Sequence, residues 1–323
     1  MLHYRRIIIK KSQAKGYIFE FVIWELLKQF GYLNVQSSKL RGRGASHQID
    51  AFGELAIPTA FMYPIRLICE CKCYSENYKV RLPHIRNFVG VMKDISENYI
   101  VYKSGERNVA KRHNDVGCFF SASSFTIDAQ EYAWAHNIFI ISFNNNSKLK
   151  YIIKDIKTFV NNTQLKNKTK KEIIRQFKES NFSFSEDKNI SVAIGIIDGV
   201  YPVTLIGNQK WLYDIDNMTD NLSEIILAEK TQRKSNKFDT LFTLNVRGEK
   251  INFTLPNIIA NKIKNRVDQT NSGEQIFTID IPYIRNINDN SIRRFVKIIV
   301  KLPNYEKEEY KKHIQIVQEE NLR

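Results

Sequence analysis

The chain has 323 residues, of which 43% are hydrophobic and 12% aromatic, enough apolar material for one large domain or two ordinary ones. It has no run of about 18 apolar residues, and its start lacks the apolar segment of a secretory signal, so we expect a cytoplasmic protein without a membrane partner. The net charge of +15, of which +10 lies in residues 1–160, favours a polyanionic partner, although biased use of Lys, Asn and Ile would produce the same excess.

The first 145 residues predict a mixed α/β domain. Residues 13–30 predict a largely buried helix because apolar side chains recur at spacings of three and four, and Gly31 ends it. Three strands follow as a meander, with the basic turn LRGRGAS between the first two. A helix and a strand-helix-strand unit with parallel strands complete the domain. The predicted strands of the meander span 32–39, 47–53 and 65–74, the helix 80–95, and the last unit 116–122, 126–137 and 138–143.

The second half is separated from this domain by a polar segment. Residues 161–189 are rich in lysine and contain one short helix, so we expect a domain at 1–160, a linker at 161–189 and a smaller α+β domain at 190–323. The last domain carries no motif of known mechanism, and a role in specificity, regulation or oligomerisation stays open. Its expected strands are 190–197, 238–246, 250–255, 275–281 and 295–302, and its expected helices lie near 221–230, near 257–266 and at 304–323.

The segment IRLICECKCY, residues 65–74, places two charges in a run that otherwise predicts a buried strand. Alternate side chains of a strand share a face, so Glu70 and Lys72 point one way and the cysteines point the other. Buried without partners, the two charges would be strongly destabilising, so they pair with neighbours or line a functional site. An exposed cross-strand ion pair is the alternative, but the flanking residues are too apolar for a solvated strand.

Asp50, in the preceding strand segment HQIDAFG, supplies a second carboxylate. Adjacent antiparallel strands can place it beside Glu70, and two close carboxylates repel unless a cation lies between them. Mg²⁺ is bound in proteins through one or two carboxylates together with waters and substrate phosphate. Lys72 beside such an ion would orient and help to deprotonate an attacking water, or stabilise negative charge on the phosphate.

These residues resemble the PD-(D/E)XK nuclease pattern, with Asp50, then Glu70, Cys71 and Lys72 at the end of a hydrophobic strand, and Glu20 on a preceding helix. The order of elements over roughly residues 12–145 is similar to the Mrr-like restriction endonuclease branch. KGYIFEFVIWELLKQFGY resembles its opening helix, ICECKCY its central strand, and FFSASSFTIDAQEYAWAHNIFIIS its closing strand, helix and strand. The resemblance implies a restriction-endonuclease-like mixed sheet flanked by helices.

The resemblance also implies a role for each of these residues. Asp50 and Glu70 would ligate Mg²⁺, with Mn²⁺ as a substitute, and the backbone carbonyl of Cys71 would add a third oxygen. Lys72 would activate the water, and Glu20 would support a metal or a water from the helix. For Glu20 the alternative is an ordinary acidic residue that the dipole favours in the first turns of a helix.

Other polar residues near this strand are weaker candidates for the site. Gln48 lies on the strand face of Asp50 and is a candidate supporting residue, and His47 is the one histidine beside the site. No histidines have the spacing of a metal motif. The cysteines at 69, 71 and 73 lack the CxxC spacing of structural zinc sites, so we expect them to pack in the core, with a metal or redox role as the alternative.

Basic residues on both sides of the predicted site are candidates for contacting DNA phosphates. They are Arg41 and Arg43 in the LRGRG turn and Lys79, Arg81 and Arg86 after the central strand. For each residue alone a solvated basic surface is an equal alternative, whereas together they fit a phosphate-binding cleft.

The sequence thus predicts a Mg²⁺-dependent DNA endonuclease that hydrolyses phosphodiester bonds in double-stranded DNA, and the resemblance implies a restriction or phage-defence role. A junction resolvase or repair nuclease of the same fold is one alternative. A non-catalytic nucleic-acid-binding protein is another, against which the complete set of Asp50, Glu70 and Lys72 argues. A homodimer, the recognition sequence, dependence on DNA modification and any activating signal are left open.

Overall fold

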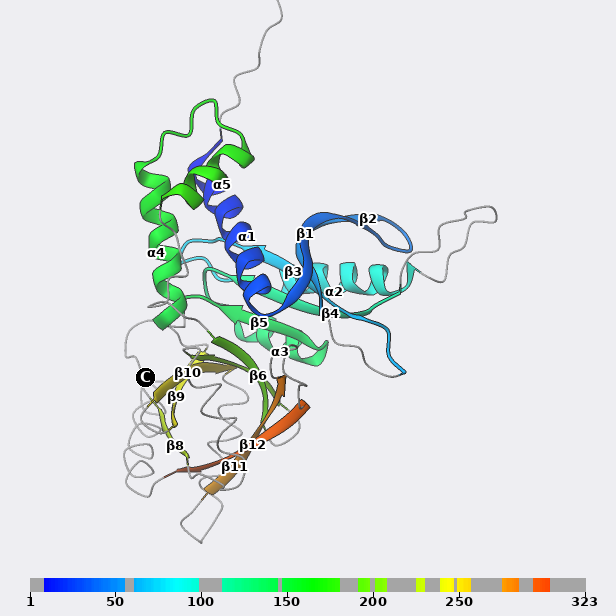
Figure 1. The fold of residues 1–323 in the computed structure, drawn as a ribbon, viewed down its shortest axis with the longest axis vertical. Coiled ribbons are helices and arrows are strands. Elements are labelled where there is room, and N and C mark those ends of the chain that lie inside the picture. The colour runs from blue at the N-terminus through cyan, green and yellow to red at the C-terminus, as the bar shows by residue number, and fades with distance from the viewer. Residues whose placement is uncertain are drawn as a thin grey trace, which may run out of the picture. The chain divides into compact units, whose positions relative to one another are not determined.

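The computed structural model describes residues 9–55, 61–98, 112–144 and 147–180, and seven strands between residues 191 and 302. The chain divides into two compact units, Met1–Ser185 and Glu186–Arg323, and each unit has its own sheet (Figure 1). All residues of the predicted site lie in the first unit.

The centre of the first unit is a five-stranded sheet whose strand order follows the chain. The first three strands form the predicted antiparallel meander, and the last two add in parallel. The strands are β1 (Tyr32–Arg41), β2 (Ser46–Leu55), β3 (Ile65–Lys72), β4 (Asn114–Ser121) and β5 (Ile138–Ser142). The helices are α1 (Lys11–Gln29), α2 (Leu82–Ser96), α3 (Ile127–Ala135), α4 (Ser147–Asn162) and α5 (Lys170–Glu179).

Helices cover both faces of this sheet, as two neighbouring phenylalanines of β4 show. Phe119 packs edge-on against Phe88 of α2, with 5.8 Å between ring centroids. Phe120 packs against Phe143 at 6.5 Å, and Phe143 contacts Phe19 of α1 at 5.0 Å. Because successive strand residues point to opposite faces, α1 and α2 lie on opposite faces of the sheet.

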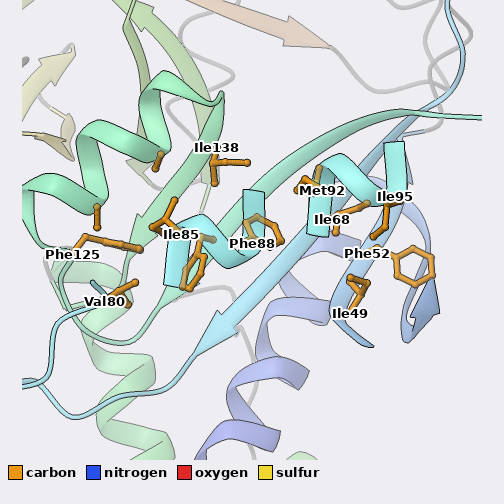
Figure 2. Close-up of a cluster of buried hydrophobic side chains, with 13 residues drawn as sticks. Ile49, Phe52, Ile68, Val80, Ile85, Phe88, Met92, Ile95, Phe125 and Ile138 are labelled. Atoms are coloured by element: carbon orange, nitrogen blue, oxygen red, sulfur yellow. The ribbon is translucent and has the colours of Figure 1, made fainter. Parts of the chain in front are cut away.

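A contiguous hydrophobic core fills the face beneath α2 and α3 (Figure 2). The buried side chains of α2 recur at spacings of three and four and pack toward Ile68 of β3 and Phe119 of β4. Each such burial contributes about 1.5–3 kcal/mol, so the core holds β3 firmly in the sheet. Phe119 is the register partner of Glu70, so the predicted site adjoins this core.

The other face is covered by α1, on which α4 and α5 pack. Gly31 follows α1 with φ 80°, a left-handed conformation that favours glycine and confirms the predicted end of the helix. Phe21 of α1 contacts Phe177 of α5 at 6.4 Å between ring centroids, and Phe177 contacts Phe159 of α4 at 5.1 Å. The segment predicted as a polar linker therefore includes a helix packed into the first unit, because Phe177 and the buried Ile173 give that helix an apolar stripe.

In the second unit, seven strands form a closed sheet in the order β10, β7, β6, β11, β12, β8, β9. All neighbours are antiparallel except β8 and β12, which are parallel. The strands are β6 (Ser191–Ile197), β7 (Tyr201–Gly207), β8 (Ile225–Glu229), β9 (Asp239–Val246), β10 (Glu249–Pro256), β11 (Gln275–Ile284) and β12 (Arg293–Leu302).

The predicted elements of the first unit, from the opening helix to the closing strand, are confirmed. The helix predicted near 221–230 is wrong for Ile225–Glu229, because pairing with β9 and β12 overrides the helix-forming preference of its Leu, Ala and Glu residues. The helices predicted near 257–266 and at 304–323 lie outside the described residues. Within the described residues, no helix combines the length and the apolar character needed to cross a membrane.

Candidate active site

The predicted site lies where β2 and β3 part. Antiparallel pairing joins Ala51 to Cys69, which makes Asp50 and Glu70 the next residues along the two strands. Asp50 Oδ2 accepts a hydrogen bond from the backbone N–H of Cys71 at 2.8 Å. Burial raises the pKa of Asp50 above its ordinary value, and the hydrogen bond from Cys71 opposes this shift. The aspartate is thus a half-buried carboxylate that is fastened to the neighbouring strand.

Glu70 and Lys72 form an ion pair at the end of β3. Their side chains are 24% and 30% exposed, respectively. Burial raises the pKa of Glu70, the negative charge of Asp50 raises it further, and the Lys72 ammonium lowers it. Burial alone would lower the pKa of Lys72, but the carboxylates of Glu70 and Asp50 reverse this effect and raise it. Lys72 is therefore protonated at neutral pH.

The helix α1 brings Glu20 to the same place. The Glu20 side chain is 17% exposed, and burial raises its pKa, while a hydrogen bond from Lys170 opposes the shift. The charges of Asp50 and Lys72 also shift the pKa of Glu20. One helical turn further on, Trp24 Nε1 donates to the backbone carbonyl of Asp50 at 2.7 Å, which ties α1 to β2. Glu20, Asp50, Glu70 and Lys72 therefore share one electrostatic environment.

Sequence reasoning misses one residue of this environment. Lys170, the first residue of α5, places its Nζ 2.6 Å from Glu20 Oε2. The same Nζ lies 4.9 Å from the ring centroid of Tyr17 and 5.9 Å from that of Trp24. Lys170 belongs to a lysine-rich run in which no local pattern distinguishes it from its neighbours. Only the packing of α5 on α1 reveals its position.

Two polar residues predicted beside the site make their contacts within the β1–β2 hairpin and with α2. The Gln48 amide donates to Ser37 Oγ at 3.2 Å and to the backbone carbonyl of Ile49 at 3.3 Å. His47 Nε2 lies 2.6 Å from Asp94 Oδ2 of α2. These contacts serve the hairpin and its attachment to the helix.

The turn between β1 and β2 is fastened to α2 through Asp94. Its carboxylate accepts hydrogen bonds from the backbone N–H groups of Gly44 at 2.7 Å and Ala45 at 3.1 Å. Gly42 comes so close that a Cβ atom there would lie 2.0 Å from Asp94 Oδ2. These backbone hydrogen bonds and the contact with His47 lower the pKa of Asp94 to about 2.

The residues predicted to contact DNA fall into two groups at opposite ends of α2. Arg41 and Arg43 belong to the hairpin attached at the carboxyl-terminal end, where Arg43 Nη1 lies 3.5 Å from Glu97 Oε2. At about 1.5 Å per residue, α2 separates the two groups by about 20 Å. The other group comprises Lys79, Arg81, whose guanidinium lies 5.6 Å from the Tyr78 ring centroid, and Arg86, which lies 5.6 Å from that of Tyr132.

The cysteines are free thiols, and Cys69, Cys71 and Cys118 are buried. Burial raises the pKa of the Cys71 thiol well above its ordinary value, so the group is neutral at physiological pH. The predicted core packing is confirmed for Cys69 and Cys71, while Cys73 is partly exposed.

The donor atoms at the site fit a hard divalent cation. In the described part of the chain, no three His, Cys, Asp or Glu side chains gather as a ready-made metal cage. Asp50 and Glu70 nevertheless provide two carboxylates at the junction of two strands, where the negative charge of Asp50 raises the pKa of Glu70. Mg²⁺ needs no more than one or two carboxylates, because waters and substrate phosphate complete its octahedral shell.

Comparison with known proteins identifies a family for the first part of the chain. Residues 12–149 match the family model Mrr_cat, described as a restriction endonuclease. No curated protein matches the chain.

Solved structures with a similar backbone include a protein of unknown function, AF1548, at 14% identity and a TM-score of 0.33, covering 51% of this chain and 97% of that one. The DNA modification-dependent restriction endonuclease AspBHI matches at 13% identity and a TM-score of 0.28, and the match covers 53% of this chain and 40% of that one. The MspJI restriction endonuclease, in complex with a 27-mer oligonucleotide, matches at 11% identity and a TM-score of 0.26. This match covers 53% of this chain and 32% of that one. The match thus spans less than half of the last two proteins.

The family match and the mixed sheet with flanking helices agree on one segment. The matched residues run from the start of α1 to the start of α4 and contain Glu20, Asp50, Glu70 and Lys72. The predicted restriction-endonuclease-like fold is confirmed for this part of the chain. The chain therefore carries, at residues 12–149, a restriction endonuclease domain of the Mrr-like PD-(D/E)XK type.

Proposed function

We propose that this domain is a Mg²⁺-dependent endonuclease that hydrolyses phosphodiester bonds in double-stranded DNA. The observation that carries the proposal is the position of Asp50, Glu70 and Lys72 together at the point where β2 and β3 part. Two carboxylates can hold a divalent cation for phosphodiester hydrolysis, and an ammonium beside them can stabilise the negative charge that develops on the phosphate.

Asp50 and Glu70 would hold the cation, which when bound supplies Lewis acid chemistry at the phosphate. The backbone N–H and C=O of a strand residue point toward the same neighbouring strand. The Cys71 N–H points to Asp50, whereas the carbonyl of Lys72 accepts from Ala122 on the other side. This pattern favours the Cys71 carbonyl as a third oxygen ligand on the Asp50 side.

Lys72 would act as a cation, since its ammonium is paired with the Glu70 carboxylate. In that state it orients the attacking water and stabilises the negative charge that develops on the phosphate. Glu20 would support a water or the metal from α1. Its half-buried carboxylate is close enough for the charges of Asp50 and Lys72 to shift its pKa.

The two basic groups along α2 support a duplex substrate. A spacing of about 20 Å corresponds to roughly six base pairs at ~3.4 Å per base pair. Arg41 and Arg43 at one end, and Lys79, Arg81 and Arg86 at the other, would contact phosphates on both sides of the site. A role in restriction or phage defence accords with the family, and the second unit would then recognise a sequence, a modified base or a partner.

Cleavage assays test the proposal. The purified chain is incubated with linear, supercoiled, methylated, single-stranded and four-way-branched DNA, in Mg²⁺ and in EDTA. We expect Mg²⁺-dependent cutting of duplex DNA that is abolished by EDTA. Preference for branched DNA would instead indicate a junction resolvase, and tight DNA binding without turnover would indicate a non-catalytic binding protein.

A further inference from the structure

Lys170 lies outside the segment that matches the restriction endonuclease family, yet it contacts a residue of the candidate site. We propose that Lys170 is a positioning residue of the nuclease site, which acts by holding the Glu20 carboxylate in place. This inference rests on the proposed function and adds to it, because it makes α5 a part of the active unit.

The Lys170 ammonium lies among one carboxylate and two aromatic rings. Nζ donates to Glu20 Oε2 at 2.6 Å and lies within 6 Å of the ring centroids of Tyr17 and Trp24. The aromatic faces attract the ammonium and restrict its side chain. The neighbouring Lys171 is exposed, so the chain offers a matched lysine without this environment.

The helix that carries Lys170 is fixed at both ends. At its start, the Thr169 hydroxyl accepts from the Glu172 backbone N–H at 3.3 Å, and the Glu172 carboxylate accepts from the Thr169 N–H at 2.7 Å. This reciprocal cap stabilises the start of the helix. Near its end, Phe177 packs against Phe21 of α1. Lys170 therefore reaches Glu20 from a capped helix that packs on α1.

The ion pair also favours the ionised form of Glu20. Its carboxylate is half-buried and lies in the field of Asp50, which disfavours the charged form. The Lys170 ammonium opposes both effects and holds one oxygen of the carboxylate in a hydrogen bond. Loss of this partner would leave Glu20 without its orienting contact, and misplacement of a site group by about 1 Å can cost roughly 100-fold in rate.

Four variants and one double variant test the proposal: Lys170→Gln, Lys170→Arg, Lys171→Gln, Glu20→Gln, and Lys170→Gln with Glu20→Gln. Single-turnover cleavage is measured well below each unfolding midpoint, and DNA binding is measured in EDTA. We expect Lys170→Gln to lower the rate by roughly 10- to 100-fold, Lys170→Arg to restore most of it, and Lys171→Gln to leave it unchanged. In the Glu20→Gln background, Lys170→Gln should have little further effect.

DNA binding in EDTA should be the same for Lys170→Gln and Lys171→Gln, because the Lys170 ammonium is directed at Glu20 and not at phosphate. A selective loss of binding in Lys170→Gln, a rate equal to or above that of the wild type, or an equal loss with and without Glu20 would each overturn the proposal. If the wild-type chain cuts no DNA, the proposed function fails and this inference with it. An active wild type with an unimpaired Lys170→Gln variant overturns this inference alone.

Discussion

The carboxylate of Asp50 on β2 accepts a hydrogen bond from the backbone N–H of Cys71 on β3 at 2.8 Å. Cys71 lies between Glu70 and Lys72, so the contact fixes the aspartate relative to both charged residues of the next strand. The backbone donor also stabilises the ionised form of Asp50 against the effect of burial. One hydrogen bond thereby sets the geometry of the site without using either of the other side chains.

Replacing Lys72 by Ala is expected to abolish cleavage and to leave DNA binding nearly intact. Lys72 acts on the attacking water or the phosphate charge, whereas affinity for DNA is distributed over many basic residues. Lys154→Ala, an exposed change on α4, is the matched control and should retain full activity. Cleavage by Lys72→Ala at the wild-type rate would remove this residue from the mechanism.

Asp50→Asn is expected to weaken Mg²⁺ binding and cleavage together. The amide oxygen can still accept the hydrogen bond from Cys71, so the fold is retained while one negative charge is lost. Mn²⁺ binds such sites more tightly than Mg²⁺ and should restore part of the activity. The measurement is the cation concentration that gives half-maximal cleavage. A variant with the wild-type Mg²⁺ dependence would show that Asp50 does not hold the cation.

The parts of the site that follow local rules were predictable from the sequence. Strand alternation puts Glu70 and Lys72 on one face, and antiparallel pairing puts Asp50 beside them. Lys170 follows no local rule, because its position depends on how α5 packs on α1. The strand β8 escaped prediction for a related reason, since one of its two partners, β12, is distant in sequence. Local patterns determine individual elements, while contacts between distant elements depend on packing.

Gly42→Ala is expected to destabilise the domain, because the new Cβ would lie 2.0 Å from Asp94 Oδ2. Either the turn moves away from α2 or the Asp94 side chain moves and gives up its hydrogen bonds to the turn. Overpacking of this kind typically costs about 1–3 kcal/mol. Gly16→Ala is the matched control, since a Cβ atom there meets nothing within 4 Å and the position lies inside α1. That control should stabilise the helix by about 0.4–1 kcal/mol. Urea unfolding of both variants checks the comparison.

Asp94 should make the attachment of the hairpin to α2 sensitive to acid. Its pKa is lowered from 3.8 in the unfolded chain to about 2 in the folded one, so its contribution is complete above about pH 4 and is lost as the pH falls through 2. Asp94→Asn removes this pH-dependent contribution. The difference in stability between wild type and variant should therefore shrink between pH 5 and pH 2. A difference that stays constant over this range would rule out the titration of Asp94 as its source.

The first unit is expected to fold and to cleave DNA without the second unit, and to be more stable when the fragment includes α5. A fragment of residues 1–185 retains the sheet, every candidate catalytic residue and Lys170, and should fold and cleave DNA. A fragment of residues 1–162 lacks Phe177, which covers Phe21 of α1 and Phe159 of α4. Exposure of large apolar side chains costs about 1.5–3 kcal/mol each, so the shorter fragment should have a lower unfolding midpoint and weaker activity.

The longer fragment also reports on the second unit. If residues 186–323 recognise a sequence or a modified base, the 1–185 fragment should cut with less selectivity or bind DNA more weakly than the full chain. Cleavage patterns on methylated and unmethylated DNA, together with affinities in EDTA, distinguish these results. Identical selectivity and affinity would argue against a role of the second unit in DNA recognition. An insoluble 1–185 fragment would mean that the two units depend on one another for folding, because a unit with its own core should stay folded after the cut.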